Sequence, residues 1–305
     1  MHSGEITLSL DVRFTNRILH FIVNRDDQKY YYIEDHHEKS VRELIEWHQT
    51  TKTPVTSASG AILKNAISKP KWILKNDSIR MTKKLGEGAF GEVYLAEFVP
   101  DNGKLIKTAV KTMREHCTRD ARLKFMKEAR IMRKFSHPNI VQIIGIVVDA
   151  HPLLILMELC PGGSVLSYLR KNRGRINASL KLRFTAESAD GLAYLESVKC
   201  IHRDIAARNI LLSESHQVKV SDFGMSDERT IVQDEKLDKV PIKWLAPETM
   251  QQRIYSNKTD VWSYGIMVNI SNSYYSLAVC EFSVNLLISI ICGQREHSKI
   301  KSENR

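Results

Sequence analysis

The interpretation of this chain is decided by the stretch Ile201-His202-Arg203-Asp204-Ile205-Ala206-Ala207-Arg208-Asn209. It places a carboxylate, Asp204, five residues before an amide, Asn209. Such a carboxylate can accept a proton from a substrate hydroxyl, and the amide oxygen can hold a magnesium ion against nucleotide phosphates. His-Arg-Asp alone is a tripeptide that chance often supplies, so the interpretation depends on companion motifs in the right order.

A glycine-rich stretch stands upstream: Leu85-Gly86-Glu87-Gly88-Ala89-Phe90-Gly91-Glu92-Val93. Its Gly-x-Gly-x-x-Gly spacing is weak evidence alone, because the glycines of a dinucleotide-binding turn share it and open a helix. Here Val93-Tyr94-Leu95-Ala96 continues as a strand, which favours a hairpin whose backbone amides approach phosphates closely. Further along, an apolar strand ends at Lys111, and a helix predicted over residues 119–135 carries Glu128.

More motifs follow Asn209 in order: Asp222-Phe223-Gly224, Ala246-Pro247-Glu248 and Asp260-Val261-Trp262-Ser263. With the elements above, their order and spacing make a chance match negligible, and residues 79–268 resemble the protein kinase family. The resemblance implies an α+β bilobal fold with a β-rich N-terminal lobe and a helical C-terminal lobe. We expect the C-terminal lobe to be incomplete in this chain.

The resemblance also implies roles for single residues. Asp204 would accept the hydroxyl proton, and Arg208 would neutralise charge near the transferred group. Lys111, held by Glu128, would bind the α- and β-phosphates. Asn209 and Asp222 would hold Mg²⁺, or Mn²⁺ in its place, and ATP is the expected nucleotide. The nucleotide would lie among Leu85, Gly86, Glu87, Gly88, Ala89, Phe90, Gly91, Glu92, Val93, Ala109, Lys111, Met157, Glu158 and Cys160.

Two details narrow the resemblance to tyrosine kinases. The run from Asp204 to Asn209 carries Ala-Ala-Arg, where serine/threonine kinases typically have a lysine two residues after the aspartate. Val240-Pro241-Ile242-Lys243-Trp244 is the tyrosine-kinase form of the segment before Ala-Pro-Glu and would shape a shelf for the longer phenol side chain. The implied reaction is transfer of the ATP γ-phosphoryl group to tyrosine in protein substrates.

Residues 1–50 predict a small sheet followed by a helix. Ser40 is a plausible N-cap for that helix, with Glu43 three residues on. The pieces resemble the C-terminal half of a Src-homology-2 domain: Ile6-Thr7-Leu8-Ser9-Leu10, Leu19-His20-Phe21-Ile22, Tyr30-Tyr31-Tyr32-Ile33 and Ser40-Val41-Arg42-Glu43-Leu44-Ile45. Such domains bind phosphotyrosine through an arginine on an earlier strand, which is missing here, so we expect this partial domain not to bind phosphotyrosine.

Residues 51–78 have the composition of a linker. A partial Src-homology-2 domain followed directly by a kinase domain resembles the Fes/Fer family of non-receptor tyrosine kinases. A cytoplasmic location follows from the resemblance and agrees with the five cysteines, which include no Cys-x-x-Cys pair, and with the absence of a visible secretory signal. The net charge of +10 is scattered rather than gathered, so we expect no nucleic-acid partner and membrane contact that is peripheral at most.

The segment from Asp222 to Glu248 contains no tyrosine. Members of the family usually carry one there, and its phosphate pairs with basic residues that include the arginine of His-Arg-Asp. Two hypotheses remain open: a carboxylate stands in for that phosphate on Arg203, or the segment is a flexible acidic loop. The carboxylates are Asp227, Glu228, Asp234, Glu235 and Asp238.

After Val268 the family resemblance stops, and residues 269–305 form a divergent tail. Its apolar stretch Ser276–Cys292 contains Glu281 and Asn285 and is slightly short for a membrane span, although a membrane anchor is one alternative. The tail predicts a truncated or alternatively read gene product. The chain is therefore either an active tyrosine kinase, a catalytically impaired ATP-binding scaffold or a product without function of its own.

Overall fold

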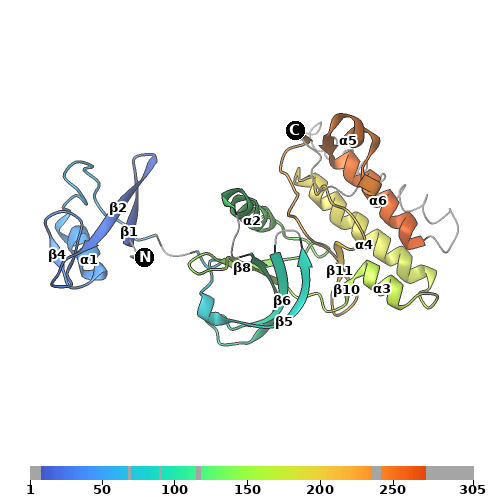
Figure 1. Ribbon diagram of the computed structural model, residues 1–305, viewed down its shortest axis with the longest axis horizontal. Coiled ribbons are helices and arrows are strands. Elements are labelled where there is room, and N and C mark those ends of the chain that lie inside the picture. Colours follow the sequence, from blue (N-terminus) through green and yellow to red (C-terminus); the bar gives the residue numbers. More distant parts are fainter. Residues whose placement is uncertain (1–7, 68–69, 89–90, 115–117, 235–241, 273–305) are drawn as a thin grey trace, which may run out of the picture. The chain divides into compact units, whose positions relative to one another are not determined.

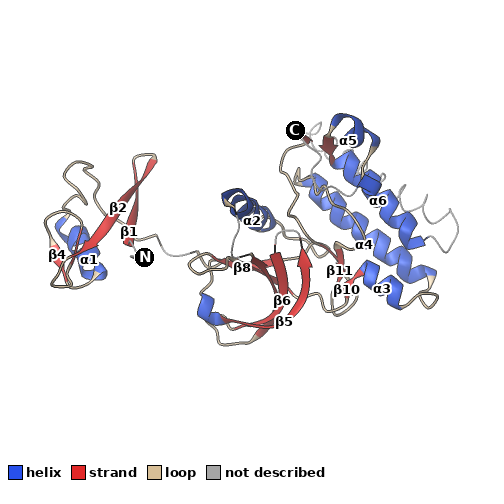
Figure 2. Ribbon diagram, viewed as in Figure 1, coloured by secondary structure: helices blue, strands red, loops and turns tan. Residues whose placement is uncertain are grey.

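The computed structural model describes residues 8–67, 70–88, 91–114, 118–234 and 242–272 (Figure 1). The chain divides into two compact units, Met1–Pro70 and Lys71–Arg305. Among the described residues, the first unit has one sheet and one helix, and the second unit has several of each (Figure 2).

The first unit is built on an antiparallel sheet with the strand order β1-β2-β3-β4. Helix α1 follows and is capped as the sequence predicts: the Oγ of Ser40 accepts a hydrogen bond of 3.2 Å from the N–H of Glu43. Val12 and Phe21 face the core from neighbouring strands. The elements are β1 (Leu8–Phe14), β2 (Arg17–Arg25), β3 (Tyr31–Tyr32), β4 (His37–Glu38) and α1 (Val41–Thr51).

Part of the predicted linker, residues 51–78, belongs to this first core. Val55 and Ala61 are almost fully buried in one cluster with Val12 and Phe21. The backbone N–H of Val55 also donates to the carbonyl of Ala61 at 2.8 Å, which closes a tight loop. Single apolar residues among Thr, Ser and Lys thus fix a stretch whose composition predicts no structure.

The end of the same stretch belongs to the second unit. The N–H of Leu74 donates to the carbonyl of Ile146 at 2.8 Å, and the N–H of Ile146 donates to the carbonyl of Trp72 at 2.8 Å. The Arg133 guanidinium lies 4.4 Å from the centroid of the Trp72 ring. The chain therefore enters this unit along β8 and beside the end of α2.

The β-rich lobe of the second unit is an antiparallel sheet with the order β5-β6-β7-β9-β8. Helix α2 lies beside this sheet (Figure 1), and its Phe125 and Ala129 are buried in one cluster with Ile146 and Ile155. The elements are η1 (Asn76–Ser78), β5 (Ile79–Gly88), β6 (Gly91–Phe98), β7 (Ile106–Met113), α2 (Arg119–Met132), β8 (Ile143–Val147) and β9 (Leu154–Glu158).

The other lobe is mostly helical, which confirms the expected α+β bilobal fold. Helices α4 and α6 contact each other, and the Tyr264 O–H donates to the carbonyl of Thr185 at 2.9 Å. One buried cluster holds Met132 of α2, Leu192 of α4 and Met267 of α6, so the two lobes share a core. The elements are β10 (Gly163–Ser164), α3 (Val165–Lys171), α4 (Ala178–Ser197), β11 (Ile210–Leu212), β12 (Val218–Val220), β13 (Ile231–Gln233), η2 (Ile242–Trp244), α5 (Pro247–Gln252), β14 (Ile254–Ser256) and α6 (Asn257–Asn272).

In the part of the chain that the structure describes, no helix is long and apolar enough to cross a membrane. The apolar stretch Ser276–Cys292 lies outside the described residues.

The close approach of the chain entry to β8 can be tested at Gly145. A Cβ at this position would overlap the carbonyl oxygen of Trp72 and lie 2.7 Å from Cγ of Leu74. We therefore expect Gly145→Ala to lower the free energy of unfolding by about 1–3 kcal/mol, because the packed segment must shift. Gly86→Ala is the control, since nothing lies within 4 Å of its Cβ position. Equal denaturant midpoints for the two variants would contradict the packing.

Candidate active site

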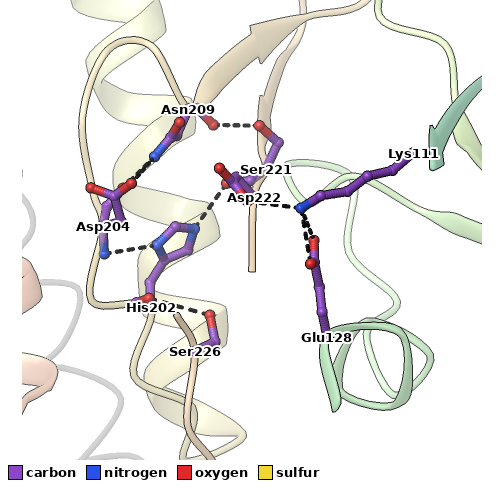
Figure 3. A network of polar contacts seen from close by, with 8 residues as sticks. All are labelled: Lys111, Glu128, His202, Asp204, Asn209, Ser221, Asp222 and Ser226. Carbon is purple, nitrogen blue, oxygen red and sulfur yellow. Dashed lines mark hydrogen bonds and ion pairs between the residues drawn. The ribbon is translucent and has the colours of Figure 1, made fainter. Parts of the chain in front are cut away.

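A buried ion pair joins the sheet to α2. Lys111 lies on β7, opposite Val93 of β6 and Ile155 of β9, and its Nζ is 2.7 Å and 2.9 Å from the two carboxylate oxygens of Glu128 (Figure 3). The residues Lys111 and Glu128 are only 8% and 3% exposed. Thr118 caps α2 by accepting a hydrogen bond from Ala121, so the helix starts where Glu128 can reach the sheet.

Asp222 is the third charged group of this cluster. Its Oδ1 lies 3.2 Å from Lys111 Nζ. Burial favours the neutral lysine, but Glu128 and Asp222 outweigh it and raise the pKa of Lys111. Burial likewise opposes ionisation of Asp222, yet the Lys111 ammonium holds the pKa of that carboxyl below its usual value. The ammonium is therefore charged at neutral pH and faces two carboxylates.

The loop that contains Asp204 is held in place by Asp260 of α6. The two carboxylate oxygens of Asp260 accept hydrogen bonds from the backbone N–H of His202 at 2.7 Å and of Arg203 at 2.8 Å. Asp260 is 5% exposed, and burial raises the pKa of its carboxyl, although both hydrogen bonds favour the ionised form.

His202 is buried in the middle of the network (Figure 3) and joins the loop to β12. The N–H of Asp204 points to its Nδ1 at 3.3 Å, so Nδ1 is the acceptor. Its Nε2 then carries the proton and donates to the carbonyl of Ser221 at 3.0 Å. Both ring nitrogens of a neutral imidazole are thereby used, and the residue next to Asp222 is fixed to the loop.

Asp204 and Asn209 come together as the sequence predicts. The Nδ2 of Asn209 donates to the backbone carbonyl of Asp204 at 2.8 Å and to its Oδ2 at 2.7 Å. Since the amide nitrogen faces Asp204, the amide oxygen of Asn209 remains available to another ligand. Arg208 donates from Nη2 to Oδ1 of Asp204, and its guanidinium lies 5.3 Å from the centroid of the Trp244 ring.

Phe223 fixes the position of Asp222. Its side chain is 1% exposed, and its ring centroid lies 5.0 Å from that of Phe135 and 4.9 Å from that of His202. It shares a buried cluster with Met132, so it packs against the helix that carries Glu128. Asp222 itself has a φ of 64°, in the left-handed region that costs a non-glycine residue about 1–3 kcal/mol. Packing of Phe223 holds this backbone.

The glycine-rich stretch forms the predicted hairpin of β5 and β6, with Gly88 opposite Gly91. A Cβ at Gly91 would overlap the backbone carbonyl of Thr112, so the close approach of β6 to β7 requires glycine there. Space around the Cβ position of Gly86 is open, which suits an approaching phosphate. Leu85, Glu87, Glu92 and Val93 are described in this hairpin, whereas Ala89 and Phe90 lie outside the described residues.

The residues expected around the adenine lie on β7, on β9 and just after β9. Ala109 is paired with Met157 across the two strands. The N–H of Glu158 donates to the carbonyl of Gln142 at 2.9 Å, so only the carbonyl of Glu158 remains to be offered to a base. Burial raises the pKa of the Cys160 thiol to about 12, which keeps it protonated and unreactive.

The oxygen donors present fit a nucleotide-bound metal ion. Asp222 supplies a carboxylate and Asn209 an amide oxygen, both of the hard type that Mg²⁺ prefers. Where the structure is described, no group of three or more His, Cys, Asp or Glu side chains could hold a metal by itself. Mg²⁺ usually takes one or two protein oxygens together with phosphates and waters, so this donor set matches it.

Further residues contribute contacts to the site, although no sequence motif indicates these contacts. Ser221 donates from Oγ to the carbonyl of Asn209 at 2.7 Å, and Ser226 donates to the carbonyl of His202 at 3.3 Å. Lys127 of α2 lies 2.8 Å from a carboxylate oxygen of Asp227. These contacts form because segments that are distant in the sequence approach one another. Only the contact of Ser221 could have been suspected from the sequence, because Ser221 directly precedes Asp222.

Known proteins are similar in sequence to most of this chain. Residues 79–275 match a family model described as protein tyrosine and serine/threonine kinase. Fer-related kinase 1 of Caenorhabditis elegans is 53% identical over 268 residues, which cover 87% of this chain and 68% of that protein. Tyrosine-protein kinase Fer of Homo sapiens is 39% identical over 282 residues, or 92% of this chain and 33% of that protein.

A viral relative agrees with these two. The tyrosine-protein kinase transforming protein Fps of Fujinami sarcoma virus is 37% identical over 268 residues, or 87% of this chain and 30% of that protein. The chain thus spans about two thirds of the nematode relative and about a third of the human and viral ones. On the family match and these identities, the chain belongs to the protein kinase family, and its kinase domain is of the Fer/Fes tyrosine-kinase type.

Proposed function

We propose that this chain transfers the γ-phosphoryl group of ATP to tyrosine hydroxyls of protein substrates. The observation that carries the proposal is the contact of Arg208 with Asp204, made from within Ala-Ala-Arg. It brings a guanidinium to the carboxylate without a lysine at position 206. Serine/threonine kinases typically have a lysine at the position of Ala206, so here the Arg208 guanidinium supplies the positive charge next to Asp204.

Each residue has a task in the proposed transfer. Asp204 orients the hydroxyl and accepts its proton while the hydroxyl oxygen attacks the γ-phosphorus in line with the leaving oxygen. Lys111, kept in place by Glu128, holds the α- and β-phosphates. Asn209 and Asp222 would hold Mg²⁺, which neutralises charge on the phosphates when bound. Positioning and electrostatics supply most of the rate, because the protein forms no covalent intermediate.

The preference for tyrosine over serine rests on η2, the short helix just before Ala246-Pro247-Glu248. Trp244 lies beside the Arg208 guanidinium, so η2 borders the position where a substrate hydroxyl meets Asp204. Ile242 is 69% exposed on the same short helix. An exposed border of this kind supports a long phenol side chain better than a short serine.

We further propose a domain layout of a Src-homology-2-like part over 1–50, a linker over 51–78 and a kinase domain over 79–268. The antiparallel strands β1 and β2 followed by α1 support the first part, although burial of Val55 and Ala61 extends its packing into the linker. We propose a cytoplasmic location, which suits the free thiols of Cys160 and Cys200.

The role of Asp204 predicts a loss of transfer without a loss of binding. Asp204→Asn keeps an oxygen that can accept from Arg208, but the amide cannot accept the substrate proton. We expect kcat to fall by about 10²–10⁴-fold, with the nucleotide-induced rise in melting temperature retained. The assay uses a tyrosine peptide and a matched serine peptide. Equal rates on the two peptides would contradict the tyrosine preference, and nucleotide binding without transfer by the unaltered chain would indicate an ATP-binding scaffold.

The metal site predicts a magnesium-dependent effect on stability. A non-hydrolysable ATP analogue should raise the melting temperature of the unaltered chain more with Mg²⁺ than without it, because Asp222 and Asn209 would hold the metal together with the phosphates. In Asp222→Asn the magnesium-dependent part should be largely lost. Asp101→Asn, in the exposed turn between β6 and β7, is the matched control and should behave as the unaltered chain. A full magnesium effect in Asp222→Asn would rule out this carboxylate as a ligand.

A further inference from the structure

The guanidinium of Arg203 is enclosed between two segments. Its side chain is 10% exposed, and it lies 4.0 Å from the centroid of the Tyr255 ring. Its Nη2 is ion-paired with Oδ2 of Asp234, and its buried Nε has no partner among the described atoms. The backbone N–H of Arg203 is bound by Asp260. The Arg203 side chain thus ties Asp234, in the activation segment (residues 222–248), to the backbone directly before Asp204.

Strand pairing delivers Asp234 to this position. In the register of β13 with β14, Val232 lies opposite Tyr255. Val232 is 1% exposed and packs in a cluster with Ile201 and Leu245. The N–H of Asp234 then donates to the carbonyl of Arg253 at 3.2 Å. The backbone on both sides of the ion pair is therefore fixed by hydrogen bonds and by a buried valine.

Of the five candidate carboxylates, Asp227 and Glu228 are also described, and both pair with cations other than Arg203. Asp227 is bound by Lys127 and by Arg229, and Glu228 lies 2.5 Å from Lys134 Nζ. Lys127 lies on α2 and Lys134 just beyond it, so these two acids face that helix. Glu235 and Asp238 lie outside the described residues.

A buried guanidinium without a counter-charge is costly, and a carboxylate meets part of the need that a phosphate would meet. A phosphate brings about two negative charges and three acceptor oxygens, whereas a carboxylate brings one charge and two oxygens. Ser226 is 3% exposed and donates to His202, so its hydroxyl is closed to modification in this arrangement.

We propose that the Asp234 carboxylate stands in place of an activation-segment phosphate on Arg203, so that this kinase is ordered for catalysis without phosphorylation of that segment. Asp234 is then a positioning residue that acts on Asp204 through Arg203. The inference rests on the proposed tyrosine kinase function. The sequence left two hypotheses open, a carboxylate in place of the phosphate on Arg203 or a flexible acidic loop. The inference selects the first and identifies the carboxylate as Asp234.

The first test measures transfer to a tyrosine peptide by the full chain before and after treatment with a protein phosphatase. We expect the unaltered chain to keep its rate after treatment. Asp234→Asn should lower kcat by about 10- to 100-fold, because a charge-assisted hydrogen bond to a buried cation is lost. The KM for ATP should change much less, since Lys111 and Asp222 are untouched. Asp234→Glu should recover part of the rate, because it restores the charge.

Glu228→Gln is the matched control. It removes a carboxylate of the same segment whose ion pair is exposed, with side chains of Lys134 and Glu228 that are 58% and 38% accessible. Such a pair contributes little, so its rate should stay near that of the unaltered chain. A phosphatase-induced loss of activity in the unaltered chain, or an Asp234→Asn variant as active as Glu228→Gln, would overturn the proposal.

A second test does not need activity and so separates this inference from the proposed function. Denaturant midpoints are measured for Asp234→Asn, Arg203→Gln and the double variant. If the two side chains form the pair described, the double variant should lose clearly less stability than the sum of the single variants. If the stability losses of the single variants are additive in the double variant, the inference is wrong even if the chain is an active kinase. Strong coupling in a chain that transfers no phosphate would instead confirm the ion pair and refute the proposed function.

Discussion

The ion pair of Lys111 and Glu128 is the constraint on which the rest of the site depends. Two buried charges are tolerated only when they meet each other in good geometry, because leaving either one alone costs several kcal/mol, about 3–5 by typical measurements. Glu128 can meet Lys111 only if α2 lies against the sheet, and that position is held by burial of Phe125 and Ala129. The pair in turn draws in Asp222, whose place is set by Phe223.

Much of the site could be predicted because its chemistry demands particular side chains at particular spacings. The pairing of Lys111 with Glu128 and the cap at Ser40 were both predictable in this way. The burial of Val55 and Ala61 was not, because two isolated apolar residues carry no period that would distinguish packed chain from linker. The hydrogen bond from the Glu158 N–H to the Gln142 carbonyl could not be predicted either, because it depends on how the chain before β8 meets β9.

The acidic segment illustrates a different limit. Its five carboxylates are equivalent in the sequence, and nothing local tells which one reaches Arg203. The answer lies in the register of β13 with β14, which is set by burial of Val232 opposite Tyr255. The contact of Arg208 with Trp244 is hidden for the same reason, because it joins segments far apart in the chain. Local spacing predicts the reacting groups, and non-local pairing decides what supports them.

The way the chain enters the kinase unit has a mechanical consequence. Trp72 and Leu74 are hydrogen-bonded along β8, while the Trp72 ring lies under the guanidinium of Arg133, just after α2. A pull on the polypeptide before residue 71 is therefore borne first by those backbone bonds and by that stacked cation. The same load reaches the helix that carries Glu128 within one or two contacts. Force on the preceding chain is thus expected to act on the helix whose Glu128 holds Lys111.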